Sequence, residues 1–102
     1  MNERKGTMSN LDGKIILITG AAKGMGATEA KMAVERGATV ILSDIIEDQL
    51  KTTADSLDSA FSRLDVTSKD DWEKTISKII DDYGRIDGLA VSYTHLTLPT
   101  KA

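Results

Sequence analysis

The sequence predicts an α/β fold built on a doubly wound parallel sheet with helices on both faces. Two observations lead to this class. Short aliphatic runs rich in β-branched residues alternate with longer segments whose apolar residues recur at helical spacing. The connections between them are short, and strands that alternate with helices form right-handed crossovers. The predicted order is β-α-β-α-β-α-β.

The four predicted strands are short. The first, Lys14–Thr19, has an unbroken aliphatic core, which suits a strand buried on both faces of a parallel sheet. The second is β-branched and runs from Thr39 to Ser43, just before Asp44. Two further runs, 61–66 and 86–90, are the third and fourth candidates.

Helical spacing separates these runs. Ala30, Ala33 and Val34 form a stripe of small residues that lets the first helix lie close to the sheet, and Gly37 ends this helix. A weaker stripe marks the second helix, and Thr67 or Ser68 is expected to cap the third. The apolar positions of these two helices are Leu50, Ala54 and Leu57, then Trp72, Ile76, Ile79, Ile80 and Tyr83 before Gly84.

Composition excludes several classes of protein. With 102 residues, the chain has room for one domain, and its net charge of −3 argues against binding to nucleic acid. It contains no cysteine, so there is no disulfide framework or thiolate metal site, and no metal site is predicted. The longest aliphatic run is too short to cross a membrane, and residues 1–7 lack the apolar region of a secretory signal. A cytoplasmic location is therefore expected.

The glycine-rich segment Thr19-Gly20-Ala-Ala-Lys23-Gly24-Met25-Gly26 follows a predicted buried strand and opens a predicted helix. This is the context of a dinucleotide-binding turn in a Rossmann-type fold. Glycines allow the backbone to approach a pyrophosphate, and the helix N-terminus offers unpaired N–H groups. A simple strand-to-helix turn is the alternative interpretation.

Asp44 closes the second strand, at the position where an acidic residue accepts hydrogen bonds from the adenosine ribose. It would repel a 2′-phosphate, which favours NAD over NADP. The alternative is an aspartate that caps the following turn. Lys23 favours NADP instead, because a cation in the loop could bind a 2′-phosphate. The alternative is that Lys23 is only a solvated charge in the loop.

These residues together resemble the short-chain dehydrogenase/reductase family over Leu11–Leu89. The family's Thr-Gly-x-x-x-Gly-x-Gly pattern is matched at 19–26, and its Asp-Val-Thr after the third strand at 65–67. Within the family, the combination of 65–67, Asp71-Trp72 and 87–89 is similar to NAD-dependent 3α/20β-hydroxysteroid dehydrogenases. Trp72 alone is better interpreted as a helix core residue.

The resemblance implies an NAD-dependent oxidoreductase that acts on a secondary alcohol or ketone and forms homo-oligomers. An NADPH-linked 3-oxoacyl or carbonyl reductase, or a nucleotide-binding module without chemistry, are the alternatives. In the family the Asp and Val after the third strand hold the adenine ring. The implied cofactor-binding residues are Gly20, Lys23, Gly24, Met25, Gly26, Asp44, Ile45, Asp65 and Val66.

The sequence departs from the family after the fourth strand. The family's Asn-Asn-Ala-Gly is replaced by residues 90–95, and the catalytic Asn, Ser and Tyr-x-x-x-Lys pair are missing. Tyr93 and Lys101 are eight positions apart rather than four, and His95 has no carboxylate near it in the sequence. No catalytic residue is therefore assigned, and we expect this chain to be inactive.

The tail also differs in composition, because the only histidine and the only proline, Pro99, lie in the last ten residues. The segment 91–100 resembles a translation of the transposon-end adaptor used in DNA sequencing libraries. We expect three segments: a disordered extension at 1–10, a partial NAD(P)-binding domain at 11–90 that is truncated after the fourth strand, and a disordered non-native tail at 91–102. A genuine C-terminal strand and loop is the rival interpretation.

Overall fold

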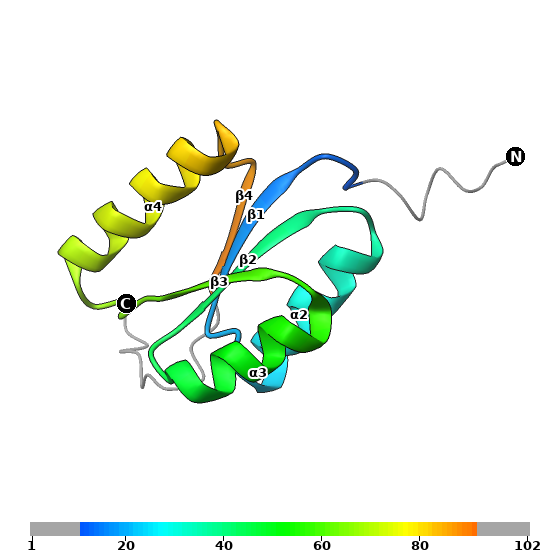
Figure 1. The fold of residues 1–102 in the computed structure, drawn as a ribbon, viewed down its shortest axis with the longest axis horizontal. Coiled ribbons are helices and arrows are strands. Elements are labelled where there is room, and N and C mark those ends of the chain that lie inside the picture. Colours follow the sequence, from blue (N-terminus) through cyan, green and yellow to red (C-terminus); the bar gives the residue numbers. More distant parts are fainter. Residues whose placement is uncertain (1–10, 92–102) are drawn as a thin grey trace, which may run out of the picture.

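The computed structural model describes residues 11–91, which form a four-stranded parallel sheet with helices on both faces (Figure 1). The order across the sheet is β3-β2-β1-β4. This confirms the predicted doubly wound α/β class. The strands are β1 (Ile15–Thr19), β2 (Thr39–Asp44), β3 (Ala60–Arg63) and β4 (Gly88–Val91), and the helices are α2 (Gly24–Glu35), α3 (Glu47–Leu57) and α4 (Lys69–Tyr83).

The helices divide between the two faces of the sheet. Helices α2 and α3 lie together on one face, and α4 lies on the other (Figure 1). Alternation along the strands supplies a core to each face: Ile18 and Leu42 pack with Leu50 of α3, whereas Leu17 and Ile41 pack with Ile79 of α4. After β3 the chain returns across the sheet to pair β4 with β1. The carboxyl ends of β1 and β4 thus flank the point where the strand order reverses, which is where such sheets bind ligands.

Local signals at the helix ends behave as expected. The N–H of Gly37 donates to the Val34 carbonyl, and the N–H of Ala38 donates to the Ala33 carbonyl, each at 3.0 Å. These two bonds form the Schellman motif, so α2 ends as the glycine predicted. Of the two capping candidates for α4, Ser68 is the cap: its hydroxyl accepts from the Asp71 N–H at 3.2 Å.

Most predicted strand boundaries are correct to within one residue, but two differ by more. The third strand ends at Arg63 rather than Val66, because the Asp65 carboxylate accepts from the Thr67 N–H at 2.9 Å and turns the chain out of the sheet. The fourth begins at Gly88 rather than Ile86.

The start of β4 is set by Asp87, the residue before the strand. Its N–H donates to the Ile15 carbonyl at 2.7 Å, and its carboxylate accepts from the Ile15 N–H at 2.8 Å. Asp87 thus ties the start of β4 to the start of β1. At its other end β4 includes Val91, which pairs with Thr19, so the strand extends one residue past the predicted domain boundary. The predictions for 1–10 and for 92–102, including Tyr93, His95 and Lys101, concern positions outside the described residues.

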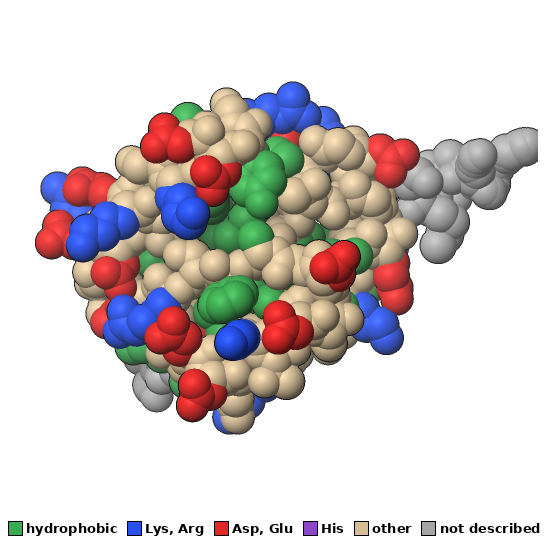
Figure 2. Space-filling view, viewed as in Figure 1, with side chains coloured by type: hydrophobic (Ala, Val, Ile, Leu, Met, Phe, Trp, Pro, Cys, Tyr) green, Lys and Arg blue, Asp and Glu red, His purple; other side chains and the backbone are tan. Residues whose placement is uncertain are grey.

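The apolar stripe predicted for α4 was only partly correct. Ile79 is buried and Trp72 and Ile76 are partly buried, but Ile80 and Tyr83 are 43% and 38% exposed. The inner face of the helix is completed by Thr75 instead. Figure 2 shows hydrophobic side chains at the surface between α4 and the helices of the other face, among intermixed acidic and basic groups. Within residues 11–91, no helix is both long and apolar enough to cross a membrane.

Candidate functional site

The segments that carry the predicted site residues meet at the carboxyl edge of the sheet. Gly20 follows β1, Asp44 ends β2 and the loop 64–68 follows β3. Backbone hydrogen bonds join the three segments. The Ala21 N–H donates to the Ser43 carbonyl at 2.9 Å, and the Leu64 N–H donates to the Asp44 carbonyl at 3.0 Å. The strands therefore bring together residues that are more than 40 positions apart in the sequence.

The glycine-rich loop has a backbone that glycine makes possible. Gly20 and Gly24 have φ of 66° and 67°, in the left-handed region that side chains disfavour. Gly26 lies on the first turn of α2 directly against Gly20. A Cβ at position 26 would lie 2.0 Å from the Gly20 carbonyl oxygen and 2.6 Å from its carbonyl carbon. The third glycine thus allows the helix to pack against the loop that precedes it.

The N-terminus of α2 differs from the N-termini of the other described helices. Its cap residue, Lys23, is extended and makes no capping hydrogen bond, and the first turn of α2 contains no acidic residue. In contrast, α3 carries two acidic residues in its first turn, and α4 carries two together with its serine cap. The first N–H groups of a helix need acceptors, and its dipole favours an anion. The first turn of α2 therefore suits an external anionic group.

Asp44 is almost fully buried, with 2% of its surface exposed. One carboxylate oxygen accepts from the Ala22 N–H at 3.0 Å, and the other accepts from the Ile46 N–H at 3.1 Å. The second of these bonds is the turn-capping role considered as the alternative for this residue. The first joins the aspartate to the glycine-rich loop.

A second contact fixes the glycine-rich loop from the side of α3. The Thr53 hydroxyl donates to the Ala22 carbonyl at 2.6 Å. Both polar backbone atoms of Ala22 are thus held by side chains, one from β2 and one from α3. These bonds hold the loop between β1 and α2 in one conformation.

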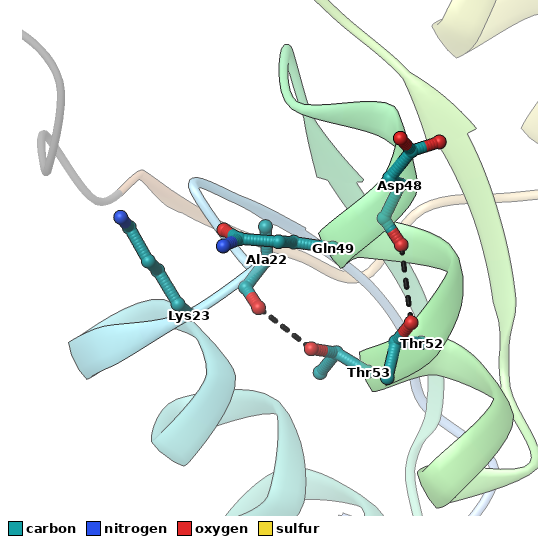
Figure 3. Close-up of a pocket in the computed structure, with 6 residues that line it drawn as sticks. All are labelled: Ala22, Lys23, Asp48, Gln49, Thr52 and Thr53. Carbon is teal, nitrogen blue, oxygen red and sulfur yellow. Dashed lines mark hydrogen bonds between the residues drawn. The ribbon is translucent and has the colours of Figure 1, made fainter.

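A shallow depression lies between the loop and α3. Figure 3 shows the Lys23 side chain on one side of it and Asp48, Gln49, Thr52 and Thr53 of α3 on the other. Lys23 is exposed, and so are two other predicted site residues, Met25 at 70% and Ile45 at 42%. Large exposed apolar side chains beside a polar loop can cover a ligand.

The loop after β3 carries the remaining predicted residues, Asp65 and Val66. The Asp65 carboxylate accepts from the Thr67 hydroxyl at 2.6 Å and from the Thr67 N–H at 2.9 Å. These two bonds lower the pKa of Asp65 below its ordinary value of 3.8; desolvation opposes them, and the charge of Arg63 lowers the pKa by the smallest amount. Asp65 is therefore an ionised hydrogen-bond acceptor at neutral pH.

The chain belongs to the short chain dehydrogenase family, whose sequence pattern it matches over residues 14–96. It is 36% identical over 87 residues to 2,5-dichloro-2,5-cyclohexadiene-1,4-diol dehydrogenase of Sphingobium indicum, covering 80% of this chain and 35% of that protein. It is also 36% identical over 84 residues to the 3-oxoacyl-[acyl-carrier-protein] reductase FabG of Thermotoga maritima, covering 78% of this chain and 34% of the reductase. The chain thus spans about a third of the length of these relatives.

Solved structures agree with this assignment. A short chain dehydrogenase from Mycobacterium smegmatis superposes with a TM-score of 0.76 at 35% sequence identity, covering 79% of this chain and 37% of that one. The oxidoreductase yciK from E. coli gives a TM-score of 0.77 at 28% identity, covering 83% and 38%. The family binds nicotinamide dinucleotides, and its members include both dehydrogenases and reductases.

Sequence reasoning missed three side chains that shape the site: Thr53, Asp71 and Trp72. Thr53 bonds the loop 31 residues before it, and no local pattern reveals such a contact. The sequence pointed to Asp71 as part of the family resemblance, and to Trp72 as a helix core residue, with no role predicted for either in the loop after β3. Both also bind the loop after β3, as described below. Among the described residues, no group of three or more acidic or histidine side chains could hold a metal ion.

Proposed function

We propose that residues 11–91 bind the adenosine and pyrophosphate half of NAD. In this proposal the loop residues Gly20, Lys23, Gly24, Met25 and Gly26 hold the pyrophosphate, Asp44 and Ile45 hold the ribose, and Asp65 and Val66 hold the adenine. The observation that carries the proposal is the first turn of α2. It lacks a side-chain cap and acidic residues, and it stands beside a loop fixed by Asp44 and Thr53.

NAD is favoured over NADP because of Asp44. A 2′-phosphate placed beside a buried carboxylate meets like-charge repulsion, whereas ribose hydroxyls can donate to it.

When bound, the cofactor supplies a hydride acceptor or donor at the nicotinamide. We propose that the full-length protein is an oxidoreductase that acts on a secondary alcohol or ketone in the cytoplasm and forms homo-oligomers. Among members of the family, we propose that it is similar to the NAD-dependent 3α/20β-hydroxysteroid dehydrogenases.

One observation favours a second candidate, an NADPH-linked reductase. Lys23 is exposed at the start of α2, where its ammonium group could meet a 2′-phosphate, and a 3-oxoacyl reductase is among the similar proteins. A third candidate, a nucleotide-binding module without chemistry, shares the same cofactor contacts. It differs only in that no product of the natural gene would transfer hydride.

Calorimetric titration with NAD and NADP tests the proposal. We expect wild-type protein to bind NAD at least about tenfold more tightly than NADP. Asp44→Asn removes the charge but keeps the size of the side chain, so we expect it to reduce this preference. Lys23→Ala serves as the comparison, since it weakens NADP selectively if the second candidate is correct. Absence of binding to either dinucleotide would contradict the proposal.

The origin of residues 91–102 is a separate question, which DNA sequencing answers. We propose that this tail is translated adaptor and that the natural gene continues with a Ser and a Tyr-x-x-x-Lys in frame. A natural locus that encodes this tail would contradict the adaptor proposal. Hydride transfer to any ketone by the purified chain would contradict the expectation of inactivity.

A further inference from the structure

Two consecutive residues in the first turn of α4 bind two consecutive residues of the loop after β3. A carboxylate oxygen of Asp71 accepts from the Asp65 N–H at 2.9 Å. The indole N–H of Trp72 donates to the Val66 carbonyl at 2.8 Å. Both donors and acceptors are part-buried, where water competes less for these bonds.

A third bond lies between these two. The Ser68 N–H donates to the Asp65 carbonyl at 2.9 Å, and the Ser68 hydroxyl accepts from the Asp71 N–H at 3.2 Å. Asp71 also lies 3.4 Å from the Arg63 guanidinium, at the end of β3. The loop is therefore tied to the helix that follows it and to the strand before it.

These bonds hold three successive peptide planes. Asp71 fixes the plane between Leu64 and Asp65 through the Asp65 N–H. Ser68 fixes the plane between Asp65 and Val66 through the Asp65 carbonyl, and Trp72 fixes the next plane through the Val66 carbonyl. A planar peptide leaves only φ and ψ free, so fixing the plane on each side of a residue orients both its side chain and its N–H. The loop therefore presents Asp65 and Val66 in one orientation before any ligand arrives.

We infer that Asp71 and Trp72 are positioning residues that set the selectivity of the site for the adenine ring. This inference rests on the proposed function, in which Asp65 and Val66 contact the adenine. The Asp65 carboxylate and the Val66 N–H, held in fixed positions, can discriminate between bases that differ in their hydrogen-bonding groups. A loop that is free to move discriminates less between such bases. Neither side chain needs to touch the ligand to have this effect.

The experiment compares NAD with nicotinamide hypoxanthine dinucleotide, in which the adenine amino group is replaced by an oxygen. Trp72 is the only tryptophan in the chain, so variants that keep it can be followed by intrinsic fluorescence, and all can be followed by calorimetry. Trp72→Phe keeps an aromatic ring but removes the N–H donor. We expect NAD to bind about five- to tenfold more weakly, the effect of one hydrogen bond of typical net strength. The hypoxanthine analogue should lose less, so the ratio of the two dissociation constants moves toward one.

Two controls separate positioning from general stability. Tyr83→Phe removes a polar atom from an exposed aromatic residue at the far end of the same helix, and it should leave both dissociation constants unchanged. Inorganic pyrophosphate, which in the proposed function contacts only the glycine-rich loop and the first turn of α2, should bind wild type and Trp72→Phe equally. If Trp72 had a purely structural role, Trp72→Phe would bind all three ligands more weakly.

The Asp71 pair keeps the inference testable if Trp72→Phe does not fold. Asp71→Asn and Asp71→Ala both remove the charge, but only asparagine keeps a carbonyl oxygen to accept from the Asp65 N–H. We expect Asp71→Asn to retain the preference for NAD over the hypoxanthine analogue, and Asp71→Ala to lose it. The inference would be overturned if the ratio of the dissociation constants for NAD and the hypoxanthine analogue were the same in wild type, Trp72→Phe and Asp71→Ala. Failure of wild type to bind any dinucleotide would overturn the proposed function as well, so the two failures are distinct.

Discussion

Replacement of Gly26 by alanine is the sharpest test of the glycine-rich loop. The new Cβ would lie 2.0 Å from the Gly20 carbonyl oxygen, 2.6 Å from its carbonyl carbon and 3.0 Å from the Ala21 Cα. Ordinary contact begins at 3.4 Å, so Gly20 must move by more than an ångström. All three atoms belong to the backbone, so no flexible side chain can move aside.

The expected destabilisation follows from this geometry. Overpacking typically costs about 1–3 kcal/mol, and a clash with backbone belongs at the upper end. A domain is stable by about 5–15 kcal/mol, so we expect Gly26→Ala to fold with a clearly lower unfolding midpoint. The displaced loop should also weaken NAD binding by about tenfold or more, since its N–H groups no longer converge.

A matched variant is available at Gly88, in β4. There a Cβ would meet only the Ile16 side chain, at 3.5 Å, which is ordinary contact. We expect Gly88→Ala to be neutral or slightly stabilising, because alanine has less backbone freedom to lose in a strand. Urea denaturation and calorimetric titration of both variants provide the comparison. If Gly26→Ala matched Gly88→Ala in midpoint and in NAD affinity, the close packing of α2 on the loop would be refuted.

Three further predictions concern stability. Ser68→Ala removes the cap of α4 and should lower the free energy of unfolding by about 1 kcal/mol in urea denaturation, whereas Ser68→Asp should restore it. Asp58 ends α3 with φ of 51°, so Asp58→Gly should raise the thermal midpoint by relieving the left-handed conformation, and a lower midpoint would contradict this. The pKa of Asp87 is lowered below 3.8, first by the hydrogen bond from the Ile15 N–H and then by Arg85, so its contribution to stability is complete above pH 3.8 and is lost as the pH falls through the lowered value. A thermal melt series from pH 6 to pH 2.5 should show this loss, and Asp87→Asn should show a smaller one.

Much of the architecture could be predicted from the sequence because it depends on local patterns. The aliphatic run of β1 and the spacing of small residues in α2 predicted their positions, and Gly37 and Ser68 predicted helix ends because capping requires only neighbouring residues. The glycine spacing from Gly20 to Gly26 predicted a turn from a strand into a helix, and the structure has this turn between β1 and α2.

Strand ends and helix faces were predicted less well, since competing contacts decide them. The run through Val66 looked continuous, but the Asp65–Thr67 turn ends β3 early. Ile80 shares the helical stripe of α4, yet the orientation of the helix on the sheet turns Thr75 and Ile79 inward instead. That orientation depends on the sheet beneath the helix.

By itself the sequence determined the fold class, the glycine-rich loop and the family of this protein, because each of these depends on residue types at fixed spacing. Only the tertiary structure decided how the site is held. Asp44 of β2 and Thr53 of α3 form hydrogen bonds with the backbone of Ala22. Asp71 and Trp72 of α4 form hydrogen bonds with the loop after β3. These bonds require atoms about 3 Å apart in a particular orientation, and that geometry exists only after the elements have packed.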